Sequence, residues 1–120
     1  MGCIGERQMK KINILGTEYT LIIADAVEKP KLKNCDGYMD FSIKEIVVGK
    51  FEPTENGIEN LEVYTRKVIR HEIIHAFLYE SGLWENSGTA DAWGQDETIT
   101  DWIAMQAPKL FKAFQEADAL

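Results

Sequence analysis

The stretch RHEIIHAFLYESG, residues 70–82, holds both histidines of the chain, His71 and His75, with Glu72 between them. On an α-helix, residues four apart project from the same face on successive turns, so the two imidazoles can share one metal ion. Glu72 is rotated by about 100° from His71, which places it beside such an ion as a base for water. The stretch therefore predicts a helix with two metal ligands and a general base, provided that a third ligand exists elsewhere.

Apolar residues recur at helical spacing around this stretch, which supports a long helix; they are Leu61, Val68, Ile69, Ile73, Ala76 and Phe77. Asn56 is the expected N-cap, with Glu59 as its capping-box partner, and Gly82 is the expected stop. A second helix is expected over residues 95–107, QDETITDWIAMQA. Pro108 is expected to interrupt it and to leave a short amphipathic helix at the end of the chain.

The first half of the chain has the alternating pattern of half-buried strands. Residues 10–25 predict two strands around a turn at Gly16, and residues 38–51 predict another hairpin after a polar loop. We therefore expect an α+β fold, in which a small N-terminal antiparallel sheet is followed by the two long helices. Residues 1–120 are expected to form a single domain, with residues 1–9 as a loose lead-in.

The charge balance limits which partners are expected, and the cysteine content indicates the cellular compartment. Thirteen basic and twenty acidic residues give a formal net charge of −7, which argues against nucleic acid or an anionic membrane as a partner. Cys3 and Cys35 form no CxxC pair and are too few for a disulfide framework, so free thiols and a cytoplasmic location are expected. No apolar run reaches the roughly 20 residues of a transmembrane helix.

A zinc site needs at least a third protein ligand, and the chain has no third histidine to supply it. Glu97 is the preferred candidate, because Asp101 follows it four residues later on the same face and can accept the free N–H of a ligating histidine. Other carboxylates remain open as the third ligand: Asp91, Asp96, Asp101 itself, Glu80 and Glu85. Zinc suits this set of ligands best, although cobalt, nickel or copper would also bind to it.

A helix with HEIIH, a stop at Gly82, a loop and then ExxxD on a second helix resembles the zincin metallopeptidases with a glutamate ligand, the gluzincins. Glu97 follows His75 by 22 residues, which is in the range of that group, and the similarity covers about residues 61–109. In size the chain is similar to minimal stand-alone metallopeptidases of bacteria and phages. The resemblance implies that His71, His75 and Glu97 bind one zinc ion, Glu72 is the general base and Asp101 orients His71. The implied activity is hydrolysis of peptide bonds in a peptide or protein substrate.

The chain departs from larger gluzincins in lacking their downstream histidine or tyrosine, which stabilises the oxyanion. Tyr64 and Tyr79 are the residues that could replace it, unless both serve only in packing. In zincins an extended peptide pairs with an edge strand above the site, and residues 44–49 are the candidate edge here, although an interior position is equally open. The small loop around residues 84–93 is either a lid or a passive connector.

Two other functions compete with peptide hydrolysis. The same zinc site can stabilise a small interaction protein without turnover, or the chain can regulate a process by binding protein or DNA. Glu72 separates the first rival from an enzyme, because a purely structural site needs no base. The acidic balance and the lack of a basic recognition helix disfavour DNA binding.

Overall fold

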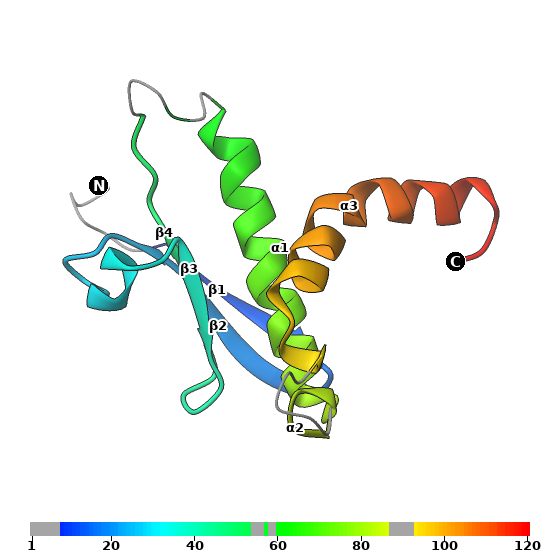
Figure 1. Cartoon of the computed structure of the whole chain (residues 1–120), viewed down its shortest axis with the longest axis horizontal. Helices are drawn as coiled ribbons and strands as arrows, with labels where there is room; N and C mark the ends of the chain where they lie inside the picture. The colour runs from blue at the N-terminus through cyan, green and yellow to red at the C-terminus, as the bar shows by residue number, and fades with distance from the viewer. Residues whose placement is uncertain (1–7, 54–56, 58–59, 87–92) are drawn as a thin grey trace.

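The computed structural model describes residues 8–53, 57, 60–86 and 93–120, and its architecture is α+β, as predicted (Figure 1). Four strands come first: β1 (Gln8–Ile14), β2 (Thr17–Ala24), β3 (Gly37–Asp40) and β4 (Glu45–Gly49), with the short helix η1 (Pro30–Lys33) between β2 and β3. The helices follow: α1 (Leu61–Glu80), α2 (Leu83–Asn86), η2 (Trp93–Gln95) and α3 (Glu97–Glu116). Within these described residues, no helix has the length and apolar character required to cross a membrane.

The sheet is mixed, and in this detail it differs from the expected antiparallel sheet. Its order is β1-β2-β4-β3, in which β1–β2 and β3–β4 are antiparallel hairpins but β2 and β4 are parallel. The segment after β2 carries the chain to the far edge, where β3 forms, and the hairpin then returns β4 to the interior. Residues 44–49 are therefore an inner strand, and β3 is the edge strand on this side.

Both hairpins form where the sequence predicts them, but the first strand begins earlier than expected. β1 and β2 are joined by Leu15 and Gly16, whose φ angles of 50° and 91° are those of a tight turn that matches the strand twist. The loose lead-in expected over residues 1–9 is too long, because Gln8 and Met9 already pair with Ile23 and Ile22. Residues 1–7 lie outside the described part of the chain.

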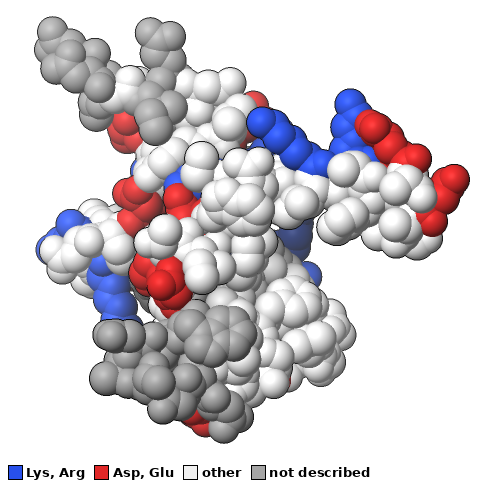
Figure 2. Space-filling view, turned by 45° about the vertical axis from the view of Figure 1, so that its right-hand side comes forward, with Lys and Arg blue, Asp and Glu red and all other residues white. Residues whose placement is uncertain are grey.

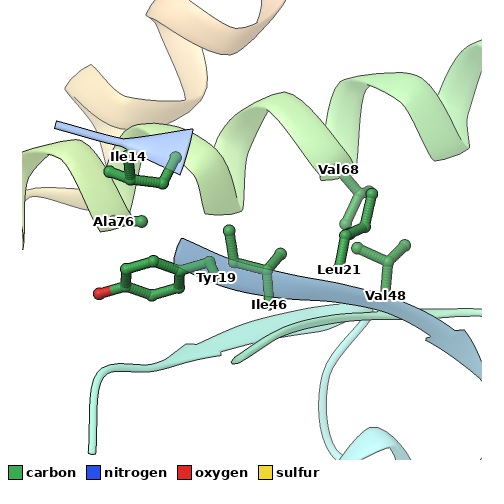
Figure 3. Packing of buried hydrophobic residues seen from close by; sticks show 7 residues of the cluster. All are labelled: Ile14, Tyr19, Leu21, Ile46, Val48, Val68 and Ala76. Carbon is green, nitrogen blue, oxygen red and sulfur yellow. The ribbon is translucent and has the colours of Figure 1, made fainter. Parts of the chain in front are cut away.

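The main core lies between one face of the sheet and α1 (Figure 3). Alternate strand residues point to this face, where they meet Val68 and Ala76 of α1; these strand residues are Ile14, Tyr19, Leu21, Ile46 and Val48. A smaller cluster of Ile22, Ala24 and Val47 fills the other face and packs against Leu32. Because β4 is buried on both faces, its run of apolar residues is that of a central strand.

Helix α1 begins at a different cap from the one expected. Asn60 is the N-cap, and its side chain accepts a hydrogen bond from the backbone N–H of Val63 at 3.1 Å. The expected cap at Asn56 and its partner Glu59 lie outside the described residues. The other end agrees with the sequence, because α1 stops at Glu80 and Gly82 adopts a φ of 87° that favours glycine.

Helix α3 is continuous through Pro108, which contradicts the expected interruption. The first half of α3 packs on α1, on the side away from the sheet, and the second half lies clear of the rest of the molecule (Figure 1). On this second half, charged side chains follow one edge and leave much of the visible surface uncharged (Figure 2). Arg70 of α1 donates a hydrogen bond to the carbonyl of Ala104, the group that loses its helical donor to the proline.

Candidate metal centre

Three of the residues that the sequence singled out converge between α1 and α3. The Nε2 atoms of His71 and His75 lie 3.1 Å apart, and Oε1 of Glu97 lies 2.8 Å from each of them. Zinc bound at about 2.0–2.1 Å to a tetrahedral set of ligands separates them by roughly 3.3 Å. The triangle is therefore a few tenths of an ångström tighter than one face of a zinc tetrahedron, a difference that small side-chain movements can remove.

The protonation pattern of His71 leaves a lone pair directed at the centre of this triangle. Its Nδ1 lies 3.0 Å from Oδ1 of Asp101, and since a carboxylate only accepts, the ring nitrogen donates. In a neutral imidazole the Nε2 atom then has no proton and faces the Glu97 carboxylate as a second acceptor. Facing acceptors repel each other unless a proton or a cation lies between them, so the donor set fits a metal ion.

Asp101, on α3, is held in place by two donors from α1. Its Oδ1 accepts from Lys67 Nζ at 3.0 Å as well as from His71. The hydrogen bond from Lys67 is the largest effect that holds the pKa of Asp101 below its usual value, and the bond from His71 adds to it. Asp101 thus remains an acceptor, which fixes the tautomer and the ring orientation of His71.

The three side chains differ greatly in their access to solvent. The His75 side chain is only 6% exposed, whereas that of Glu97 is 74% exposed. Burial is the largest effect on His75 and lowers its pKa, which favours the neutral ring that a metal requires. Partial burial acts to raise the pKa of Glu97, but hydrogen bonds with His75 and His71 hold it below its ordinary value. The triangle is therefore closed on its inner side and open on the side of Glu97.

His75 also has one nitrogen without a partner. Its Nδ1 is buried and makes no hydrogen bond with any described residue. The ring packs edge to face against Trp84, with 5.6 Å between the ring centroids. Packing rather than a second carboxylate therefore holds this ring within the described part of the chain.

Glu72 lies on the same turn of α1 as His71 and is buried, with 7% of its surface exposed. Burial is the main effect that raises its pKa, to about 7, with a further contribution from the charge of Glu97. None of the hydrogen bonds among the described residues involves its carboxylate. A buried carboxylate that no protein donor satisfies is free to hydrogen-bond with a water or a ligand in the adjoining cavity.

That cavity has a volume of about 260 Å³ and joins the metal-ligand triangle to the start of β3. It is lined by Cys35, Asp36, Gly37, Tyr64, Lys67, Val68, His71, Glu72, Glu97 and Asp101. No pattern in the sequence indicates that residues 35–37 belong to the site, because Asp36-Gly37 has the pattern of an ordinary turn. Lys67 was also missed, although its position one turn before His71 places it on the same face of α1.

The other carboxylates considered as a third ligand have different places. Glu80 accepts hydrogen bonds from Thr17, Tyr19 and Lys44 at the far end of α1. Asp96 is the N-cap of α3 and accepts from the backbone of Ile99, and Glu85 is exposed on α2. Asp91, like most of the loop around residues 84–93, lies outside the described residues. Among the described residues, only His71, His75 and Glu97 form a group with the spacing of a metal site.

The two tyrosines considered as oxyanion donors lie in different environments. Tyr64 lines the cavity, and its hydroxyl donates to Oδ2 of Asp36, which raises the pKa of Tyr64 to about 12. Tyr79 instead stacks on Phe41, with 4.3 Å between the ring centroids, and does not line the cavity. Tyr64 is thus the tyrosine that lies within reach of a molecule in this cavity.

Comparisons with known protein families, with curated proteins and with solved structures find no match to this chain. The functional assignment therefore depends on the chemistry of the site itself.

Proposed function

We propose that this protein is a zinc-dependent metallopeptidase in which His71, His75 and Glu97 hold one zinc ion and Glu72 is the general base. The observation that carries the proposal is the convergence of three ligand atoms beside a buried carboxylate that faces a cavity. When bound, zinc supplies the Lewis acidity that lowers the pKa of water and polarises a substrate carbonyl.

The residues around the ion have separate tasks in this proposal. Glu72 takes a proton from the attacking water and returns it to the leaving amine, so that one carboxylate serves as base and then as acid. Asp101 keeps His71 in the tautomer that leaves Nε2 free. Tyr64 donates towards the oxygen on which negative charge develops, once substrate has displaced its bond to Asp36.

The edge strand β3 supports a peptide as the substrate. Gly37, the first residue of β3, lines the cavity, and β3 is an edge of the sheet that the described residues form. An extended peptide that pairs with this edge would run past the mouth of the cavity. This assigns to β3 the role for which residues 44–49 are a candidate by sequence.

A zinc ion that only stabilises the fold is the main alternative. Structural zinc sites are closed by four protein ligands, whereas catalytic sites keep one position open. The exposed side of the triangle at Glu97 favours the catalytic site, as does the buried carboxylate of Glu72, which makes no hydrogen bond with the described residues.

Glu72→Gln tests the assignment, because it removes the base and nearly preserves the size of the side chain. We expect wild-type protein reconstituted with zinc to cleave a mixed peptide library, as measured by mass spectrometry of new termini. Glu72→Gln is expected to bind zinc as the wild type does and to lose at least about 100-fold in rate. Equal cleavage by both proteins would contradict the role of Glu72, and zinc binding without any cleavage would favour the structural alternative.

A further inference from the structure

Pro108 leaves one backbone carbonyl of α3 without its usual hydrogen-bond donor. Proline has no backbone N–H, so the carbonyl of Ala104, four residues earlier, lacks its helical donor. Ala104 is completely buried, and water is therefore not an adequate substitute. A buried carbonyl left without a donor costs about 1–3 kcal/mol, in addition to the cost of the proline itself.

Arg70 on α1 supplies the missing donor. Its Nε–H donates to the Ala104 carbonyl oxygen at 2.6 Å, a charge-assisted hydrogen bond between the two helices. Arg70 directly precedes His71, so the turn of α1 that carries the first metal-ligand candidate also holds α3. This bond explains why α3 continues through Pro108 where the sequence predicted a break.

The position of Ala104 connects this bond with the metal centre. Asp101 lies one turn before Ala104 and Glu97 lies two turns before it, so the three residues share one side of α3. Fixing the carbonyl of Ala104 against α1 therefore fixes the distance at which Glu97 and Asp101 approach the histidines. We propose that Arg70 is a positioning residue of the metal centre, which acts through the carbonyl that Pro108 leaves free. This inference deepens the proposed function, because it assigns the residue that sets the geometry of that site.

The ion pair between Lys67 of α1 and Asp101 of α3 is less suited to this task. Lys67 and Asp101 form an ion pair at 3.0 Å, but their side chains are 26% and 37% exposed. Ion pairs with this exposure contribute little, and a flexible ammonium group tolerates several orientations. The Arg70 bond instead joins a planar guanidinium to a buried carbonyl, whose direction is fixed by the helix.

The test compares cobalt binding by untagged wild type, Arg70→Met and a matched control, Arg66→Met. Arg66 lies one turn earlier on α1, is exposed and, among the described residues, forms its ion pair within that helix, with Glu62. Cobalt titration, followed by the visible absorption bands of the ion, is expected to show about tenfold weaker binding for Arg70→Met. Arg66→Met is expected to bind as the wild type does. Equal affinity of all three proteins would overturn the inference.

Pro108→Ala provides a second test, which separates the bond between the helices from a general loss of stability. Alanine restores the N–H that Ala104 lacks, so the carbonyl is bonded within α3 and no longer holds α3 against Arg70. Pro108→Ala and Pro108→Ala/Arg70→Met are therefore expected to bind cobalt equally, and both about tenfold more weakly than the wild type. A tenfold difference between them would overturn the proposed route through the carbonyl, and this comparison remains valid if Arg70→Met alone does not fold.

Failure of the proposed function would be recognised separately. If the wild type takes up no cobalt, the metal assignment is wrong, and the metal-free proteins then decide the role of Arg70. The chain has only two histidines, so correlation spectra of imidazole protons and nitrogens report on His71 and His75 alone. We expect these resonances to move in Arg70→Met and to stay in Arg66→Met; unchanged resonances in Arg70→Met would overturn the inference.

Discussion

At the scale of single residues, Asp101 shows how one carboxylate can orient a candidate metal ligand through a hydrogen bond. It accepts hydrogen bonds from His71 and from Lys67, and these two donors occupy the same oxygen, Oδ1. In a neutral ring, the bond from Nδ1 of His71 to Asp101 leaves Nε2 without a proton, and Nε2 faces His75 and Glu97. The metal affinity should therefore depend on Asp101.

Asp101→Asn is expected to weaken zinc binding by about 10–100-fold, because a neutral amide accepts more weakly and can present its N–H₂ group instead. Competition with a chromogenic chelator measures the affinity. Asp96→Asn is the matched control on the same helix, since asparagine caps a helix as well as aspartate does. Equal losses in both variants would show that helix α3, and not the bond to His71, limits the affinity.

Glu80 illustrates a carboxylate with a purely structural task. Lys44, Tyr19 and Thr17 donate hydrogen bonds to it, in order of their effect on its pKa, and these bonds hold the pKa below its ordinary value of 4.5. A carboxylate with a lowered native pKa stabilises the fold above its unfolded-state pKa, and that stability is lost as the pH falls through the native value.

Glu80→Gln is expected to reduce the free energy of unfolding by roughly 1–2 kcal/mol at pH 7, because it removes a charged acceptor of three bonds. The difference from wild type should shrink as the pH falls below 4.5, where the wild-type carboxylate also becomes neutral. Urea denaturation at several pH values checks this, with the exposed Glu85→Gln as control. A difference that does not change with pH would contradict the electrostatic explanation.

The sequence could predict which residues meet at the candidate metal centre because their relation is local to helices. His71 and His75 are four apart on α1, and Glu97 and Asp101 are four apart on α3, so each pair shares a face. The structure brings these two faces together. No such rule connects Gly37 with Glu72, since their contact depends on how the sheet packs on α1.

At the scale of elements, the close approach of α1 to β3 depends on Gly37. A Cβ atom at this position would lie 3.0 Å from the carbonyl oxygen of Val47, 3.0 Å from Cγ1 of Val68 and 3.4 Å from Cγ of Glu72. The missing side chain thus allows the turn of α1 that carries Glu72 to pack directly over the edge strand.

Gly37→Ala is expected to destabilise the protein by about 1–3 kcal/mol, because α1 or β4 must move to accept the methyl group. Thermal denaturation measures the loss. Cys35→Ala, which changes an exposed thiol two residues earlier, serves as control and should have little effect. A melting temperature that Gly37→Ala leaves unchanged would mean that the helix does not pack this closely on β3.

Two features of the elements could not be read from the sequence. Alternating apolar residues identify β2 and β4 as strands, but they do not encode whether the strands run parallel, which depends on where the chain crosses. Pro108 normally predicts a break, and the donor that replaces its missing N–H comes from Arg70 on another helix. In both cases a long-range contact overrides a correct local rule.

At the scale of the whole molecule, the structure consists of a compact body and a projecting half-helix (Figure 1). The radius of gyration is 15.7 Å, whereas a compact domain of this length has about 13–14 Å. Ile46 lies in the centre of the body with no exposed surface, while Phe114 on the projecting part of α3 is 45% exposed. The stability of the fold should therefore depend on the body.

Ile46→Ala is expected to reduce the free energy of unfolding by about 2–5 kcal/mol, because it leaves a cavity between the sheet and α1. Phe114→Ala removes a larger side chain but is expected to change the stability by less than about 1 kcal/mol. Chemical denaturation of both variants measures the contrast. A large loss in Phe114→Ala would show that the end of α3 packs against another surface in solution.

The metal content of the purified, untagged protein tests the central claim most directly. Elemental mass spectrometry after reconstitution should find about one zinc ion per chain in the wild type and in Glu72→Gln. His75→Ala and Glu97→Ala should each retain little zinc, because each removes one corner of the triangle. A wild-type chain without zinc would contradict the account as a whole, and zinc retained in Glu97→Ala but lost in His75→Ala would contradict the choice of Glu97 as the third ligand.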